Sequence, residues 1–426
     1  MQGLSRSSRS DNREGRDVVR QPIAVVGVGL KAPGGLTVEQ LWDSLCKGHS
    51  TARPYLDDRL PASSRVLTCS VEGFEAAGYL APADVRRLDR CHQLAIGAAQ
   101  DAIDALGGDL PAPDRCATVC GVGFGATSTW EQQHIRLLDG GLRALSPLAI
   151  PMVMPNSVAA HLSIRFGFRG SCMTVSSACA SGAAAIGEGV ELLRRDAADL
   201  VLAGGADAML SYNAICSYLR LDAMSRNVED PDRASRPFDA DRDGFVLAEG
   251  SGFVALQRLE DAVAAGRRVI GLVRGYGSNA DAHHIVAPSP GGQGALRCMR
   301  LALRDAGIGP GEVSHVNAHG TSTTLNDAAE AAALVELFGG DGPPVSAVKG
   351  TTGHMIGGSG AVETIVALVS LQRGLAPPIA GLRNLDPGCR IDAVQDQPRP
   401  LAKDGAVLSN SFGFGGSNAC LVLGAT

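Results

Sequence analysis

A strand pattern meets a helix pattern in the stretch Thr174-Val175-Ser176-Ser177-Ala178-Cys179-Ala180-Ser181-Gly182. Its β-branched start favours a strand, and the very small residues that follow favour a buried helix packed closely against its neighbours. Cys179 stands at the junction, where the free N–H groups and the dipole of a helix N-terminus favour negative charge. We therefore expect its thiol to ionise more easily than an ordinary one. Taken alone, the stretch is equally consistent with a mounted nucleophile and with one more small buried cysteine.

Composition narrows the class of protein. Of the 426 residues, 45% are hydrophobic and 19% are charged, which is ordinary for an enzyme of one large or two medium domains. The formal net charge of −6 and the lack of a basic stripe disfavour nucleic acid as a partner. None of the eleven cysteines are spaced CxxC, so we expect reduced thiols in the cytoplasm and no metal site.

The chain carries no sign of membrane targeting. No apolar run reaches the length needed to cross a bilayer, so no membrane association is expected. Residues 1–20 are rich in Ser, Arg and Asp and lack an apolar segment, which argues against a secretory signal. We interpret 1–20 as a disordered tail.

The second part of the chain repeats patterns of the first. The apolar strand pattern of 23–29, which ends in glycines, returns at 269–277. The strand-turn-helix pattern around Cys179 returns at 345–362. Such repetition predicts two copies of one α/β unit, each with a sheet covered by helices on both faces. Active groups from both copies would then meet where the two copies join.

We place the boundary between the two units at 265, so that they cover 21–265 and 266–426. The larger insertions fall in the first unit. Within that unit, apolar residues at helical spacing predict one long helix over 84–106.

Two histidines of the second unit stand in unusual surroundings. His319 lies in Asn317-Ala318-His319-Gly320-Thr321-Ser322-Thr323, where a strand pattern ends in a loop of Gly, Thr and Ser. His354 lies in Lys349-Gly350-Thr351-Thr352-Gly353-His354, at the counterpart of the Cys179 junction. Either histidine alone is more often a hydrogen-bonded structural residue. Cys179 and the two histidines all lie at strand ends in matching units, which makes a purely structural role for all three harder to accept.

These stretches resemble the β-ketoacyl-acyl-carrier-protein synthases of types I and II, in the thiolase superfamily. The stretches quoted around Cys179, His319 and His354 match three motifs of that family in their order. A fourth match is Phe412-Gly413-Phe414-Gly415-Gly416-Ser417-Asn418. The resemblance extends from about Pro22 to the C-terminus. It implies an α/β thiolase fold of two pseudo-symmetric halves, with mixed sheets in an α-β-α-β-α layering.

The resemblance also implies the chemistry. Cys179 would accept an acyl group from a carrier-protein thioester. A malonyl-carrier would then lose CO2, and the resulting carbanion would attack the acyl group in a decarboxylative Claisen condensation. His319 and His354 would stabilise the enolate oxygen as neutral imidazoles, while Lys349 and Glu363 would hold the two histidines in place.

Further residues take roles from the same resemblance. The backbone N–H groups of Cys179 and Phe414 would form the oxyanion hole, and the Phe414 side chain resembles the family's gate. Thr321 and Thr323 resemble residues that bind the phosphopantetheine arm, although hydroxyls that only satisfy the loop backbone are nearly as strong an interpretation. Gly358-Ser359 departs from the two alanines common in the family, which could reshape the pocket.

Partners are implied in the same way. The substrate would arrive on the 4'-phosphopantetheine arm of an acyl-carrier protein, with no cofactor bound. Carrier proteins are acidic, and Arg86, Arg87, Arg90 and Arg226 fall where family members place cationic docking residues. A homodimer is implied as well, with 130–171 as its interface region.

Two alternatives stay open. A ketosynthase-fold acyltransferase or cyclase of a natural-product pathway would load its chain on the same Cys179 and differ only in pocket and substrate. A non-catalytic chain-length-factor partner would replace the nucleophile, whereas Cys179 is present here together with both histidines and Lys349. The Arg/Ser-rich tail and the Gly358-Ser359 departure slightly favour a specialised pathway, and primary fatty-acid synthesis stays open.

Overall fold

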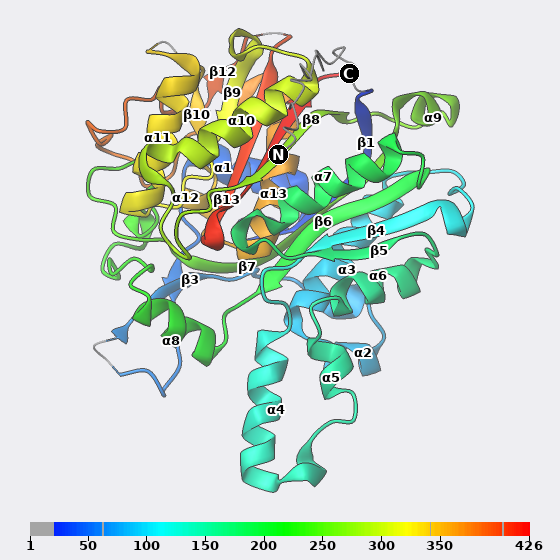
Figure 1. Cartoon of the computed structure of the whole chain (residues 1–426). Helices are drawn as coiled ribbons and strands as arrows, with labels where there is room; N and C mark the ends of the chain where they lie inside the picture. Colours follow the sequence, from blue (N-terminus) through cyan, green and yellow to red (C-terminus); the bar gives the residue numbers. More distant parts are fainter. Residues whose placement is uncertain (1–20, 62–63, 341, 403) are drawn as a thin grey trace, which may run out of the picture.

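One continuous mixed sheet runs through the molecule (Figure 1). The computed structural model describes residues 21–61, 64–340, 342–402 and 404–426, so the tail predicted over 1–20 lies outside the described residues. In spatial order the main strands are β10 (Val345–Ser346), β9 (Val313–Asn317), β13 (Ala406–Gly413), β14 (Ser417–Gly424), β8 (Gly271–Ala280), β1 (Ile23–Lys31), β7 (Leu247–Arg258), β6 (Leu200–Ala208), β4 (Cys116–Gly121) and β5 (Cys172–Val175). Short strands complete the set: β2 (Arg53–Pro54) and β3 (Leu67–Cys69) beside β7, and the separate pair β11 (Leu375–Ala376) and β12 (Arg399–Pro400).

The sheet consists of two parts with the same topology. In the first, β7 runs antiparallel to β1 and β6, and β4 and β5 continue parallel to β6. In the second, β14 runs antiparallel to β8 and β13, and β9 and β10 continue parallel to β13. The first strands of the two parts pair with each other, Ile23–Val25 against Gly271–Val273. The predicted fold of two pseudo-symmetric halves is confirmed, and β1 and β8 are the repeated strand pattern.

Helices cover both faces of each part. They are α1 (Val38–Lys47), α2 (Pro82–Arg87), α3 (Arg90–Asp104), α4 (Thr127–Gly140), α5 (Ala149–Val153), α6 (Ser157–Phe166), α7 (Ser181–Arg194), α8 (Tyr212–Arg220), α9 (Leu259–Ala264), α10 (Gln293–Ala306), α11 (Thr324–Phe338), α12 (Lys349–Thr352) and α13 (Ser359–Arg373). The equivalent helices α7 and α13 pack against each other in the centre, while α3 packs on β1 and β7 and α10 packs on β8 and β14. One apolar cluster unites α7, α13 and the inner faces of both sheet parts, and separate clusters lie under α3 and α10. This is the expected α-β-α-β-α layering.

The central helices approach each other at glycines. A Cβ on Gly182 of α7 would lie 2.6 Å from the carbonyl oxygen of Gly357, and one on Gly360 of α13 would lie 2.8 Å from the nitrogen of Ala183. Both distances are too short for a real side chain, so the small residues after Cys179 set how close α7 and α13 can pack.

The prediction of one helix over 84–106 is wrong. The chain forms α2 and α3 with a break between them, where Leu88 is extended (ψ 137°). Asp89 follows as the N-cap of α3 and accepts a hydrogen bond from the N–H of Cys91 at 3.1 Å. The same carboxylate accepts the N–H and the hydroxyl of Thr129 on α4 at 2.8 and 2.7 Å. A contact far away in the sequence thus stabilises the break.

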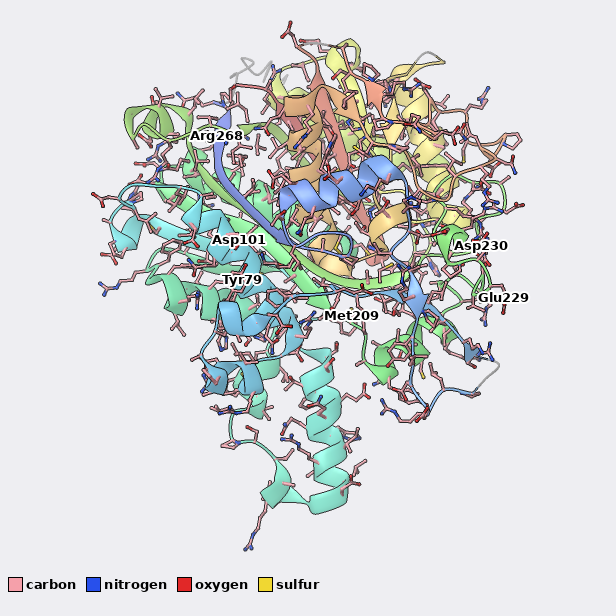
Figure 2. The ribbon with its side chains drawn as sticks, turned by 180° about the vertical axis from the view of Figure 1, so that it is seen from behind. Tyr79, Asp101, Met209, Glu229, Asp230 and Arg268 are labelled. Carbon is pink, nitrogen blue, oxygen red and sulfur yellow. The ribbon has the colours of Figure 1, made fainter. Side chains whose placement is uncertain are left out.

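A buried lysine fastens β1 to α3 on the side of the molecule shown in Figure 2. Lys31 is only 2% exposed and pairs with Asp101, whose other carboxylate oxygen accepts the hydroxyl of Tyr79 at 3.1 Å. The lysine also donates to the carbonyl of Leu36 at 3.1 Å. A buried charge in such a position needs these partners.

The two outer edges of the sheet differ. Among the described residues β5 pairs only with β4, and Cys172 on β5 is exposed. Beyond β10, by contrast, the N–H of Val345 donates to Asp392 and its carbonyl accepts the N–H of Val394, both at 2.9 Å. Near the open edge, α4 and α5 project from the body (Figure 1) and expose large apolar side chains such as Trp130 and Leu138. No helix in the described part of the chain is long and apolar enough to span a bilayer.

Candidate active site

Cys179 lies in a tight turn between β5 and α7, as predicted. Residues 178–180 form a single 3-10 turn, and Ala178 has φ 50°, a left-handed conformation that is rare outside glycine. The Ser181 hydroxyl fixes the turn, since it donates to the carbonyl of Ala178 at 2.7 Å and accepts the N–H of Ser177 at 2.9 Å. The turn aims the Cys179 side chain into a cavity while leaving it only 6% exposed.

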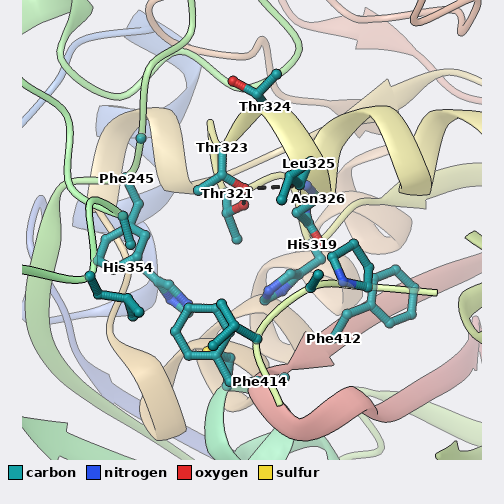
Figure 3. Close-up of a pocket in the computed structure, with 18 of the residues that line it drawn as sticks. Phe245, His319, Thr321, Thr323, Thr324, Leu325, Asn326, His354, Phe412 and Phe414 are labelled. Atoms are coloured by element: carbon teal, nitrogen blue, oxygen red, sulfur yellow. Dashed lines mark hydrogen bonds between the residues drawn. The ribbon is translucent and has the colours of Figure 1, made fainter. Parts of the chain in front are cut away.

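Both predicted histidines face this thiol. The Cys179 sulfur and one ring nitrogen each of His319 and His354 lie within 4.8 Å of one another. The two rings meet edge to face with centroids 5.5 Å apart (Figure 3). His319 comes from the loop between β9 and α11, and His354 from the turn between α12 and α13. Groups from both halves of the fold therefore meet in one place, as the repeat predicts.

Lys349 and Glu363 stand behind the histidines. Both side chains are fully buried, and the ammonium forms an ion pair with the carboxylate. Lys349 Nζ also lies 2.6 Å from the carbonyl oxygen of His319 and 3.2 Å from its Nδ1. The lysine therefore holds His319 at two atoms. Burial raises the pKa of Glu363, an effect that the lysine charge opposes.

Hydrogen bonds assign the same tautomer to both histidines. The Lys349 ammonium, which can only donate, contacts Nδ1 of His319. Ser359 Oγ accepts the N–H of Met355 at 2.9 Å and lies 3.1 Å from Nδ1 of His354, to which its hydroxyl can donate. Nε2 then carries the hydrogen in both rings. Burial, together with the lysine charge, holds the pKa of both imidazoles well below the ordinary value of 6.5, so they are neutral at pH 7.

The expectation of an easily ionised thiol is wrong. Burial raises the pKa of Cys179 to about 12. Lys349 and the backbone N–H groups of Phe414 and of Cys179 itself lower that pKa, but desolvation outweighs them. In addition, α7 begins only at Ser181, so the thiol does not sit on the first turn of a long helix. The thiol is therefore protonated at pH 7, and the two N–H groups mark where negative charge is favoured.

Sequence reasoning missed two buried carboxylates that shape the His319 loop. Glu330 accepts hydrogen bonds at 2.9 Å from the N–H groups of His319 and of the residue after it. Asp327 accepts those of Thr321 and of the residue after it, at 2.9 and 3.1 Å. Burial raises the pKa of both, that of Glu330 to about 7. The available signal was their three-residue spacing, which puts two acids among alanines on one face of helix α11.

Two cavities have Phe414 and Leu221 in common in their walls. The first, of about 300 Å³, contains Cys179, His319 and His354 in its lining. The second, of about 660 Å³, lies between α4, α5 and α8 and is lined largely by apolar side chains such as Trp130. Phe414 contributes to the walls of both. The two glycines that follow it have φ of 80° and 74°, which only glycine adopts readily.

Thr321 and Thr323 line the first cavity. Their hydroxyl oxygens are 2.9 Å apart, and that of Thr323 accepts the N–H of Asn326 at 3.4 Å as the N-cap of α11. The interpretation that the Thr323 hydroxyl satisfies the loop backbone is thus confirmed. Thr323 also lies on the cavity wall, where it could contact a pantetheine arm.

The four arginines singled out for docking have different surroundings. Arg90 forms an ion pair with Glu249 at 3.0 Å and donates to a backbone carbonyl, so it is engaged inside the protein. Arg86 and Arg87 are exposed on α2, and Arg226 is 60% exposed after α8. Since α2 and α8 lie on opposite sides of α4 (Figure 1), the arginines do not form one patch.

The site combines a cysteine that can accept an acyl group with imidazole N–H groups that can bind an oxyanion or an enolate. Together with the fold, this combination places the protein among the thiolase-fold acyltransferases. Comparison with known proteins refines this. Residues 20–262 match the family model "Beta-ketoacyl synthase, N-terminal domain", and residues 270–383 match "Beta-ketoacyl synthase, C-terminal domain". The chain belongs to the beta-ketoacyl synthase family.

Individual relatives resemble it over nearly their whole length. A 3-oxoacyl-[acyl-carrier-protein] synthase 2 of Synechocystis is 37% identical over 94% of this chain and 97% of its own. Among solved structures, the ishigamide ketosynthase/chain length factor superposes with a TM-score of 0.87 at 31% identity, over 96% of this chain and 100% of its own. A ketosynthase in complex with its type II PKS acyl-carrier protein superposes with a TM-score of 0.85 at 27% identity, over 96% and 100%.

Proposed function

We propose that this protein takes an acyl chain from an acyl-carrier protein onto Cys179 and extends it by decarboxylative condensation with malonyl-carrier protein, in fatty-acid or polyketide biosynthesis. The observation that carries the proposal is the meeting of the Cys179 sulfur with the ring nitrogens of His319 and His354 within 4.8 Å on the wall of one cavity. The neutral state of both imidazoles supports it, because a protonated imidazole would quench a carbanion.

The first step is a thioester exchange. The Cys179 sulfur bonds to the acyl carbon, the bond from that carbon to the pantetheine sulfur breaks, and the thiol proton ends on the departing pantetheine sulfur. The oxygen of the tetrahedral intermediate lies near the N–H groups of Cys179 and Phe414, the two groups that already favour negative charge at the thiol. The acyl chain of the substrate occupies the second cavity once the Phe414 side chain has moved.

The second step is the condensation. The bond between the malonyl carboxylate and the α-carbon breaks, CO2 leaves, and the electron pair remains on the enolate. The Nε2–H groups of His319 and His354 donate to the enolate oxygen. Lys349, paired with Glu363, keeps the His319 ring in that orientation, and Ser359 keeps the His354 ring. The α-carbon then attacks the acyl carbon, the bond from that carbon to the Cys179 sulfur breaks, and the departing thiolate takes a proton from water.

The partners follow from the same proposal. The phosphopantetheine arm enters by the first cavity past Thr321 and Thr323, and Arg86, Arg87 and Arg226 attract the acidic carrier.

The apolar side chains exposed over 130–171 support a homodimer. The units 21–265 and 266–426 each supply part of the site. All eleven cysteines are free thiols, which is in keeping with a cytoplasmic location.

A second candidate function uses the same loaded Cys179. The chain could transfer or cyclise its acyl group in a natural-product pathway without a decarboxylative step. The structural neighbours include the ishigamide ketosynthase/chain length factor and a ketosynthase in complex with a type II PKS acyl-carrier protein, bound to a hexaketide. The first step is common to both functions, so the fate of the loaded chain distinguishes them.

Intact-mass spectrometry tests the proposal. Wild type, Cys179→Ala and the control Cys46→Ala, which removes a partly exposed thiol on α1, are incubated with acyl-carrier proteins and then with malonyl-carrier protein. We expect an acyl adduct on the wild type and the control only, followed by a carrier-bound product longer by two carbons. An adduct that resolves without malonyl-carrier supports the second candidate. The lack of any adduct overturns both and favours a non-catalytic partner.

A further inference from the structure

A buried carboxylate outside the reacting cluster joins loops from the two halves of the fold. Asp207, near the end of β6, has no exposed surface. Its Oδ2 accepts hydrogen bonds from the N–H groups of Gly123 and Gly357, both at 2.8 Å. Its Oδ1 accepts those of Phe124 at 3.1 Å and Gly125 at 2.9 Å. One side chain thus satisfies four backbone groups.

Backbone N–H groups alone hold this charge. Asp207 has no ion pair among the residues that the structure describes. Burial raises its pKa to about 6, and the four N–H groups oppose that rise, so the carboxylate is ionised at pH 7. An ionised acceptor gives stronger hydrogen bonds than a neutral one. The loops that Asp207 joins are therefore tied firmly.

The two loops also touch each other through the carboxylate. A Cβ on Gly357 would lie 2.6 Å from Oδ2 of Asp207 and 2.6 Å from the nitrogen of Gly123. A Cβ on Gly123 would lie 2.7 Å from the same Oδ2 and from Cγ2 of Ile356. Ile356 itself has φ 48°, a strained value for a β-branched residue, so its turn needs external support.

Each loop leads to a different part of the candidate active site. Gly357 follows His354 by three residues, in the turn before α13. Phe124 is 63% exposed and lines the second cavity together with Phe414 and residues of α8. Asp207 is therefore the shared anchor of one enolate-binding histidine and one wall of the cavity proposed for the acyl chain.

We propose that Asp207 is a positioning residue that sets the acyl-chain preference of the second cavity and the placement of His354 together. This inference rests on the proposed function, because it assigns an acyl chain to that cavity. Replacement by asparagine separates the effect of the hydrogen bonds from that of size. The amide keeps one accepting oxygen and turns an NH2 group toward two backbone N–H groups, which cannot accept from it. Two of the four hydrogen bonds are lost, and the loops part there.

Single-turnover kinetics tests the inference. Asp207→Asn is compared with wild type in acylation by hexanoyl- and dodecanoyl-carrier protein and in decarboxylation of malonyl-carrier protein. We expect the ratio of the two acylation rates to change by about fivefold or more, and decarboxylation to fall by about tenfold. The matched control is Asp239→Asn. Asp239 is equally buried and accepts backbone N–H groups at 2.8 to 3.0 Å, but lines neither cavity.

The control separates positioning from general stability. Asp239→Asn should leave the chain-length ratio at its wild-type value even if it lowers the melting temperature. An unchanged ratio in Asp207→Asn, or the same change in both variants, overturns the inference. Failure of the wild type to become acylated on Cys179 would instead overturn the proposed function, so the two failures are distinguishable.

A measurement on the wild type covers the case in which Asp207→Asn does not fold. Hydrogen exchange followed by mass spectrometry reports on peptides that cover 122–126 and 355–358. Their amides lie in turns outside regular strands and α-helices, where exchange is fast unless a buried acceptor protects them. We expect slow exchange of both peptides at pH 7. Complete exchange of either within seconds contradicts the shared anchor.

Discussion

The proton of a single thiol is held more tightly than its surroundings in the sequence suggest. Burial raises the pKa of Cys179 to about 12, so thiolate is scarce at pH 7. Below the pKa the thiolate fraction grows about tenfold per pH unit, so we expect the single-turnover acylation rate to rise by about a hundredfold over the two units from pH 7 to pH 9. Rapid quenching followed by intact-mass spectrometry measures it, with Cys46→Ala as the control. A rate that levels off below pH 9 contradicts the raised pKa.

The ion pair behind His319 is a second feature of single residues with a measurable consequence. Lys349→Met leaves Glu363 buried without its partner, and we expect the free energy of unfolding to fall by about 3–5 kcal/mol. Glu363→Gln in the same chain removes the unpaired charge, so the double variant should lose less than the sum of the single losses. Urea unfolding followed by circular dichroism measures both. A loss below about 1 kcal/mol for Lys349→Met would show that the pair is not held as the structure has it.

Among the structural elements, α7 and α13 can cross closely only because glycines, which have no side chain, lie where the two helices meet. Gly182→Ala places a methyl group 2.6 Å from the carbonyl oxygen of Gly357, and we expect unfolding to become easier by about 1–3 kcal/mol. Gly189→Ala on the same helix is the control. Its Cβ meets only side-chain atoms, at 3.0 Å or more, and alanine favours the helix, so its change should stay within about 1 kcal/mol. Equal effects in urea unfolding would argue against a close crossing.

Elements built on local patterns could be predicted, and those shaped by distant contacts could not. The strand, turn and helix around Cys179 follow from residue size and branching, and β1 and β8 follow from a repeated pattern. The break before α3 escaped prediction because Asp89 is held by Thr129 of another helix. The same holds for the site. Motifs identified Cys179 and both histidines. The cavities of the site and the pKa of the thiol could not be predicted, because they depend on how all helix and sheet layers bury the site.

At the scale of the whole molecule, two buried histidines outside the reacting cluster couple folding to pH. Burial lowers the pKa of His92 and of His315 from 6.5 to about 3. Their folded-state pKa values lie below the unfolded value, so their stabilising contribution is complete above pH 6.5 and is lost as pH falls toward 3. In that window, each of the two histidines lowers the free energy of unfolding by about 1.4 kcal/mol for every unit by which the pH falls.

His315→Gln tests this coupling. Between pH 6.5 and 4.5 we expect the variant to lose about 2.7 kcal/mol less unfolding free energy than the wild type, because glutamine does not titrate. Asp207 and Glu330, whose pKa values are raised to about 6 and about 7, act in the opposite direction. The difference between variant and wild type therefore measures the histidine, and parallel urea-unfolding profiles across this pH range contradict the assignment.

The two ends of the main strand order differ in what a second copy could pair with. A sheet open at both edges can add strands at either end and grow into a filament. Here the β10 side is closed by the segment that contains Asp392 and Val394, while β5 offers its backbone on the other side. A second copy that paired with β5 about a twofold axis would cover the open β5 edge of both copies. Such an assembly would leave no β5 edge for a third copy, so growth along β5 would stop at two.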